Sequence, residues 1–161
     1  MSIPVYEGVA RALIAEGTHT IFGLMGDANM ELLGELTRRD VEFVKVRHEQ
    51  GAAAMADGYA RASGRVGVCT VTCGPGLLNT CTSLAVARAH ASPVVVLAGA
   101  SPTGDPGHLQ AFDQAAFGSV MAGTTITLSR AEEVAGGIAR AFAAARSGGG
   151  PVLVNMPMDI Q

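Results

Sequence analysis

The sequence predicts a three-layer α/β/α domain with a six-stranded, mostly parallel β-sheet. Strand-like apolar runs alternate with helical patterns along the chain, which is typical of a parallel sheet with right-handed crossovers. The run at residues 94–98 is apolar at every position, as expected of a strand covered on both faces. Hydrophobic residues make up 48% and charged residues 16% of the 161 residues, which is enough for one domain with a buried core.

In the first half of the chain, helices and strands follow one another closely. The helices have apolar residues at helical spacing, and we expect them over residues 4–16, 29–38 and 50–63. Gly17 and Gly64 end the first and the last of these. The strands are rich in β-prone residues, and we expect them over residues 20–24, 41–46 and 66–72.

The second half continues the alternation after one irregular segment. Further helices are expected over residues 77–90 and 132–146, and further strands over 94–98, 124–128 and 151–155. Residues 101–123 contain Pro102 and Pro106 and have no clean period, so we expect a long loop with room for one short helix. The three glycines at 148–150 fit a turn at a helix C-terminus rather than a domain boundary.

Composition argues against several classes of partner. The net charge is −3 and there is no basic cluster, so no nucleic-acid partner is expected. Residues 1–4 lack a signal-peptide pattern, and the longest apolar stretch, 84–100, is interrupted by charge and too short to span a bilayer. The three cysteines have no metal-ligand spacing. We therefore expect a cytoplasmic protein with reduced thiols, no membrane association and no metal site of its own.

Four unusual segments follow the first four predicted strands. In open parallel sheets, ligands bind beyond the carboxyl ends of the strands. The segments are GLMGDAN at 23–29, RHE at 47–49, TCGPGLLN at 72–79 and the loop at 101–114. We therefore expect one binding site at this edge of the sheet. The alternative is that these are ordinary glycine-rich turns.

Two of these segments carry candidate chemical groups. Glu49 is a lone carboxylate between a predicted strand and an Ala-rich helix, which makes it a candidate site group; alternatively it is a helix-start residue favoured by the helix dipole. Gly74, Pro75 and Gly76 open a helix and expose backbone N–H groups that suit an anion or a flat ligand edge. The turn lacks the Lys of a P-loop, so a purely structural turn is an equally good interpretation.

The chain resembles the N-terminal, pyrimidine-binding domain of thiamine diphosphate enzymes of the acetolactate synthase type. The resemblance runs over the whole length. The family motifs and their places here are FGxPG at 22–26, RHExxAxxxAxGYAR at 47–61, TSGPGxxN at 72–79, PxxxxxG at 93–99 and GPVxxxIPxDVQ at 150–161. Met25 stands where the family usually has Pro, and Cys73 where it has Ser. The family's FQE after the fourth strand appears here as FDQ at 112–114, so Asp113 replaces a Gln that faces substrate in acetolactate synthases.

The resemblance implies roles for residues at these positions. Glu49 would be the catalytic carboxylate that activates the cofactor through its aminopyrimidine ring. The resemblance also implies two further sets of site residues. The cofactor-binding residues would be Gly26, Glu49, Thr72, Gly74, Pro75 and Asn79, and the substrate contacts would be Asp27, Ala28, His108, Phe112 and Asp113. His108 can equally be a solvated loop residue.

The same family also uses a motif that this sequence lacks. No G-D-G segment, which in the family begins the Mg²⁺- and diphosphate-binding motif, occurs here. The resemblance therefore implies a single pyrimidine-binding domain over residues 1–161, without the central and diphosphate domains. It would be half of a 2-oxo acid decarboxylase or carboligase, inactive alone, in a homo- or hetero-oligomer whose other chain supplies the Mg²⁺ site in trans.

Several alternatives stay open at this point. The chain can be a separate subunit, a truncated homologue or a fragment of a longer protein. It can also be a non-catalytic binding or assembly module that keeps the fold, or an unrelated flavodoxin-like nucleotide binder, although it lacks the phosphate-binding Lys of such proteins. FAD occurs in some full-length members, but nothing in this sequence supports an FAD site.

Overall fold

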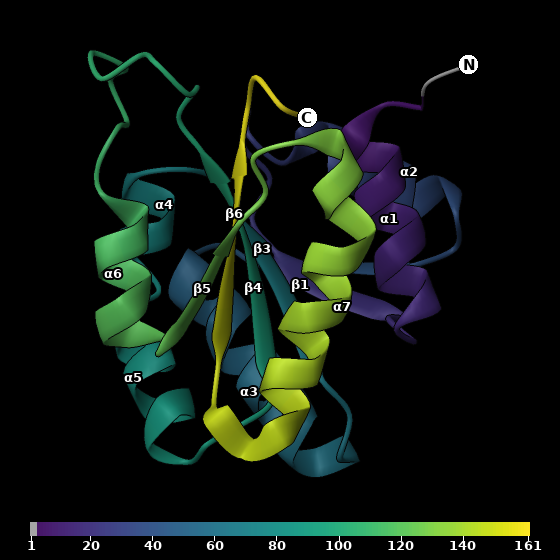
Figure 1. Ribbon diagram of the computed structural model, residues 1–161. Helices are drawn as coiled ribbons and strands as arrows, with labels where there is room; N and C mark the ends of the chain where they lie inside the picture. The colour runs from purple at the N-terminus through teal and green to yellow at the C-terminus, as the bar shows by residue number, and fades with distance from the viewer. Residues whose placement is uncertain (1–2) are drawn as a thin grey trace.

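A computed structural model describes residues 3–161 and contains one six-stranded sheet with helices on both faces (Figure 1). The strand order is β2-β1-β3-β4-β6-β5, and every pairing is parallel. The predicted fold class is confirmed, and "mostly parallel" becomes all parallel. The expectation that residues 1–4 form no export signal falls partly on Met1 and Ser2, which lie outside the described residues.

All predicted strands are present. They are β1 Thr20–Gly23, β2 Glu42–Lys45, β3 Gly67–Val71, β4 Val94–Ala100, β5 Thr124–Thr127 and β6 Val152–Pro157. The central strands β3 and β6 are buried at every residue, and β4 at every residue but the last. The edge strands β2 and β5 are half-buried or exposed. The continuous apolar runs therefore mark the strands that helices cover on both sides.

One predicted helix is divided in two. The helices are α1 Val5–Ala15, α2 Met30–Arg38, α3 Glu49–Ser63, α4 Pro75–Leu78, α5 Cys81–Ala89, α6 Gln114–Met121 and α7 Val134–Ala144. The prediction of a single helix over 77–90 is wrong, because α4 ends before Thr80 and α5 begins after it. Thr80 donates its hydroxyl and its backbone N–H to the carbonyl of Leu77, at 2.6 and 3.0 Å, and these bonds tighten and end α4. The short helix expected in the 101–123 loop is α6.

The two faces of the sheet have different cores. Helices α1, α2 and α7 cover one face with large side chains such as Leu13, Leu36 and Phe142. Helices α3, α5 and α6 cover the other face (Figure 1), where many contacts come from small residues such as Ala56 and Cys69. Small side chains let α3 approach the sheet closely, whereas large ones on the opposite face fill a wider layer.

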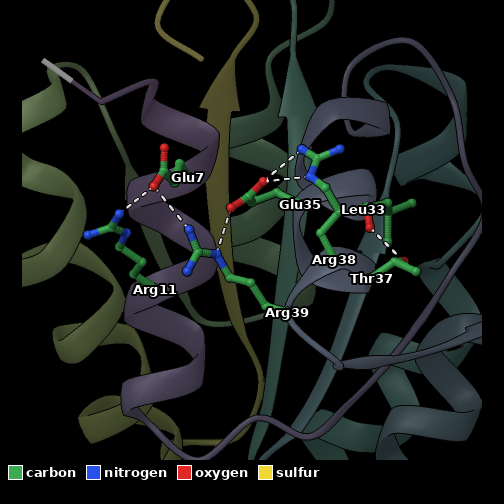
Figure 2. Close-up of polar contacts among 7 residues, drawn as sticks. All are labelled: Glu7, Arg11, Leu33, Glu35, Thr37, Arg38 and Arg39. Atoms are coloured by element: carbon green, nitrogen blue, oxygen red, sulfur yellow. Dashed lines mark hydrogen bonds and ion pairs between the residues drawn. The ribbon is translucent and has the colours of Figure 1, made fainter.

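An ion-pair network joins α1 to α2 on the large-residue face (Figure 2). Arg39 bridges the helices, with Nη2 3.0 Å from Glu7 Oε1 and Nε 2.6 Å from Glu35 Oε1. Arg38 donates to the other oxygen of Glu35 at 2.7 Å, and Arg11 pairs with Glu7. Hydrogen bonds from Arg38 and Arg39 hold the pKa of Glu35 below its usual value. This carboxylate is therefore fully engaged by the fold.

Candidate functional site

Glu49 is the first residue of α3 and is 8% exposed. The helix starts there because His48 caps it: Nδ1 of His48 accepts the N–H of Gln50 at 3.2 Å. Oε2 of Glu49 accepts a hydrogen bond from the side-chain amide of Asn79 at 2.9 Å. The fold thus brings together two predicted site residues from different turns. Ser83 fixes the same helix start, since its hydroxyl donates to the carbonyl of Gln50 at 2.9 Å.

Glycines allow close packing around this pair. A Cβ on Gly76 would lie 3.4 Å from Glu49 Oε1 and 2.7 Å from Thr72 Cγ2. A Cβ on Gly26 would lie 2.7 Å from Thr72 Cβ. Gly26, Thr72, Gly76 and Glu49 therefore form a continuous line of close contacts, and a larger residue at either glycine would push it apart.

The loop after β4 holds the turn that contains Gly74. Gly74 has φ +61°, and a Cβ there would lie 2.3 Å from the carbonyl oxygen of Gln110. Its N–H donates to Oε1 of Gln114 at 3.0 Å. The preceding thiol, Cys73, donates to Oε1 of Gln110 at 3.1 Å, and burial raises its pKa. Pro75 follows as the first residue of α4 and is exposed.

The turn after β1 is closed by a residue that the sequence analysis did not single out. Asn29 is fully buried and accepts the N–H of Gly26 through Oδ1 at 2.8 Å. Its Nδ2 donates to the carbonyl of Leu24 at 3.1 Å and to Oγ1 of Thr70 at 3.2 Å. From sequence, an Asn before a helix is assigned to capping, yet this side chain makes no cap bond. Met25, at the family's proline position, is 47% exposed.

Two predicted substrate contacts lie beside this turn. Ala28 is buried against the end of β4, where a Cβ on Gly99 would lie 2.3 Å from Ala28 Cβ. Asp27 is exposed. Both line a hollow of about 200 Å³ with Tyr6, Glu31, Met158 and Gln161. They therefore share the carboxyl edge of the sheet with Glu49 but open into a hollow that Glu49 does not line.

The other three predicted substrate contacts make local interactions. Asp113 caps α6 by accepting the N–H of Ala116 at 2.8 Å, and the Phe112 ring packs edge-on against Phe117 with 5.9 Å between centroids. Nδ1 of His108 accepts the N–H of Gln110 at 3.3 Å. Within residues 3–161, no hydrogen bond joins these three to Glu49. Their role toward a substrate stays a prediction.

A larger hollow than the one beside Ala28 does not coincide with these residues. A cavity of about 450 Å³ lies at the opposite, amino edge of the sheet, between Gly17, Gly64, Arg65, Pro93 and Arg146. We place the candidate site at Glu49 nevertheless, because a buried carboxylate, an amide and glycine backbone converge there, whereas Glu16 and Arg146 of the cavity lining pair with each other. In the described part of the chain, no three His, Cys, Asp or Glu side chains gather closely enough to hold a metal ion. No helix between residues 3 and 161 has the length and apolarity needed to cross a bilayer.

Comparison with known proteins gives a consistent result. The family model for the thiamine pyrophosphate enzyme, N-terminal TPP binding domain, matches residues 3–119. A probable acetolactate synthase large subunit from Methanocaldococcus jannaschii is 41% identical over 96% of this chain. The acetolactate synthase isozyme 2 large subunit of Escherichia coli is 41% identical over 95% of the chain.

A differently named relative shows similar identity. Human 2-hydroxyacyl-CoA lyase 2 is 39% identical over 96% of the chain. The alignments cover 27%, 28% and 25% of these three relatives. The chain thus spans about a quarter of the length of the curated relatives that it matches.

Proposed function

The chain belongs to the thiamine pyrophosphate enzymes, whose N-terminal TPP binding domain it contains, and we propose that it is the pyrimidine-binding half of an acetolactate synthase-like decarboxylase or carboligase acting on a 2-oxo acid. The observation that carries this proposal is the contact between Glu49 and Asn79 beside the glycine turn. It provides a buried carboxylate in a fixed orientation, which fits one edge of a flat aminopyrimidine ring.

Each residue has a defined task in this proposal. Glu49 would hold a proton between its carboxylate and the ring nitrogen N1′, with Oε1 facing the ring because Oε2 is engaged by Asn79. Gly74 and Gly76 would let the turn pack closely against Gln110 and Thr72 and so hold its position. Thr72, directly after β3, and Gly26, in the turn after β1, would support this turn through their close contact. When bound, thiamine diphosphate supplies a nucleophilic thiazolium carbon and an electron sink, while the protein supplies orientation and electrostatics.

The remaining requirements would be met by another domain or chain. Diphosphate and Mg²⁺ need carboxylate and amide oxygens grouped together, and the described residues offer no such group. Met55, Leu78 and Val86, on α3, α4 and α5, are each more than 40% exposed and provide apolar surface for a partner. We therefore propose residues 1–161 as one pyrimidine-binding domain of an oligomer, inactive alone. The free thiols of Cys69, Cys73 and Cys81 fit a reducing compartment such as the cytoplasm.

The test is assembly with a diphosphate-binding domain from a relative. The isolated chain should bind thiamine diphosphate no tighter than about 1 mM, since it offers only the pyrimidine contacts. The co-expressed pair should bind it at least about 100-fold more tightly and only with Mg²⁺ present. Tight, Mg²⁺-dependent binding to the lone chain, measured by calorimetry, contradicts the need for a second domain. An assembled pair without cofactor binding favours the non-catalytic alternative.

A further inference from the structure

Gln114 is a buried polar residue to which neither the sequence analysis nor the proposed mechanism gives a role. It is the first residue of α6 and 6% exposed. Its Oε1 accepts the N–H of Gly74 at 3.0 Å. Its Nε2 donates to the carbonyl of Gly99 at 3.0 Å and to Oδ1 of Asn155 at 3.1 Å. Both ends of the side-chain amide are therefore engaged inside the protein.

These bonds connect the carboxyl ends of the central strands. Gly74 follows β3, Gly99 lies in β4 and Asn155 lies in β6. Asn155 extends the chain of contacts to β5, because its Nδ2 donates to Oγ1 of Thr127 at 3.4 Å. Gln114 thus ties the glycine turn to β4 and β6, the next two strands after β3 in the sheet order.

Helix formation does not account for this side chain. Asp113 already caps α6 through the N–H of Ala116, and Gln114 turns away from the helix toward the sheet. A leucine of similar size would satisfy packing alone. An amide is needed only because a backbone donor, Gly74 N–H, and a backbone acceptor, Gly99 C=O, face it from opposite sides.

The Gly74 turn continues directly into the residues of the candidate site. The carbonyl of Gly74 accepts the N–H of Leu78 at 3.1 Å, and that of Pro75 accepts the N–H of Asn79 at 3.0 Å. The single turn of α4 therefore carries the position of Gly74 to Asn79, whose amide contacts Glu49. Displacing the turn at Gly74 would displace the donor to the carboxylate.

We propose that Gln114 is a positioning residue of the cofactor site: through Gly74 and α4 it aligns Asn79 with Glu49. The same residue would couple the loop at 101–113 to the cofactor turn, since that loop leads directly into Gln114. The role toward a cofactor rests on the proposed function. The alignment of Asn79 does not, and it is measurable in the isolated chain.

The first measurement compares Gln114→Leu with the unmodified chain by NMR. The Gly74 amide should exchange about tenfold faster or more, the size of effect expected for one lost buried hydrogen bond. The side-chain amide signals of Asn79 should shift as well. Ile138→Val is the control, because it removes one methyl group from the core of the opposite face. It should leave both signals unchanged and so separate local displacement from general destabilisation.

A second variant, Gln114→Glu, makes the hydrogen bonds of this residue depend on pH, and a purely structural role would leave Asn79 unaffected by that change. Protonated, the new carboxyl group keeps an acceptor for Gly74 and a donor for Gly99; ionised, it loses the donor. Burial should raise its pKa. The Gly74 and Asn79 signals should therefore return toward their unmodified positions as pH falls, through a transition above the usual carboxyl range that the unmodified chain lacks. This variant also serves if Gln114→Leu does not fold.

The outcomes separate this inference from the proposed function. The inference is overturned if the amide hydrogen of Gly74 exchanges at an unchanged rate in both variants. It is also overturned if that exchange becomes faster while the side-chain amide signals of Asn79 stay in place. Thiamine, added at millimolar concentration, probes the pyrimidine site. Absence of thiamine-induced shifts in the unmodified chain counts against the proposed function, while the amide measurements alone decide the inference about Gln114.

Discussion

Two glutamates of this protein are equally buried but differently surrounded. Glu35 and Glu49 are each 8% exposed. Glu35 lies on the large-residue face and accepts hydrogen bonds from Arg38 and Arg39 (Figure 2). Glu49 lies at the carboxyl edge of the sheet and accepts from the neutral amide of Asn79. Among the ion pairs of residues 3–161, none includes Glu49.

The difference shows how one fold can contain two kinds of buried acid. A charge that is neutralised by two guanidinium groups has little capacity left for a ligand and serves to join helices. A carboxylate held by one amide keeps an oxygen and its charge available. Their neighbourhoods also differ: α2 around Glu35 buries Leu33 and Leu36, whereas a Cβ on Gly76 would lie only 3.4 Å from Glu49 Oε1.

The largest expected effect separates the two glutamates by function. Glu49→Gln in the assembled enzyme should slow hydrogen–deuterium exchange at C2 of bound thiamine diphosphate by about 10²–10⁴-fold, the range for a lost acid–base group. Glu35→Gln is the matched control and should leave that exchange unchanged. Equal exchange rates in the two variants would mean that Glu49 only starts a helix.

The next effect tests whether the large-residue face contributes chiefly to stability. Leu36 is fully buried, and Leu36→Ala should reduce the free energy of unfolding by about 2–5 kcal/mol through lost transfer energy and the cavity left behind. Urea denaturation measures this. Leu109→Ala, at a side chain 97% exposed, should change it by less than about 0.5 kcal/mol. The Asn79–Glu49 contact, followed by NMR, should remain in Leu36→Ala.

A smaller effect tests the close approach of α3 to the sheet. A Cβ on Gly67 would lie 2.0 Å from the carbonyl oxygen of Ala56, so Gly67→Ala should destabilise the protein by about 1–3 kcal/mol. Gly58 lies on α3 with Ala56 and has nothing within 4 Å of its Cβ position. Gly58→Ala should therefore stabilise by about 0.5–1 kcal/mol, because glycine is unfavourable inside a helix. If both variants unfold at the same urea concentration, the close approach of Ala56 to Gly67 does not limit the stability of the fold.

The smallest effect is the pH dependence of the Glu35 contacts. The pKa of Glu35 is lowered in the folded protein, mainly by the hydrogen bond from Arg38, so these contacts stabilise the fold above the unfolded value near 4.5. That contribution is lost as pH falls through the lowered folded pKa. Glu35→Gln should therefore be less stable than the unmodified chain at neutral pH, by a difference that disappears in acid. The half-exposed arginines keep this difference small. Urea titrations at both pH values test it.

Local sequence patterns predicted a helix or strand well where the pattern itself causes that element to form. The apolar run of β4 and the alternation of strands with helices placed every strand of the sheet. The helix expected over 77–90 was wrong because its division depends on the hydroxyl of Thr80, which bonds back to Leu77. Helical periodicity describes which face is apolar, but it does not include a side chain that competes for backbone groups.

The candidate site was predicted unevenly for a similar reason. Glu49 and the turn at Gly74 stood out because an acid and a glycine turn at strand ends are unusual locally. Asn29, Gln110 and Gln114 were missed as site residues. Their partners lie far away in sequence: Gln114 bonds to Gly74 across 40 positions, and Asn29 to Thr70 across 41. A single polar residue before or at the start of a helix gives no sign of such a partner.

The sequence by itself determined the order of strands and helices, the apolar faces and the edge of the sheet where unusual residues gather, because these follow from periodicity and chain direction. Arg38 and Arg39 follow Glu35 at helical spacing, so those two ion pairs are local. The tertiary structure alone decided that Arg39 also reaches Glu7 on α1 and that Glu49 faces Asn79, because these contacts depend on how the helices are placed. Pairing across space is fixed only when separate elements pack, so no local pattern contains it.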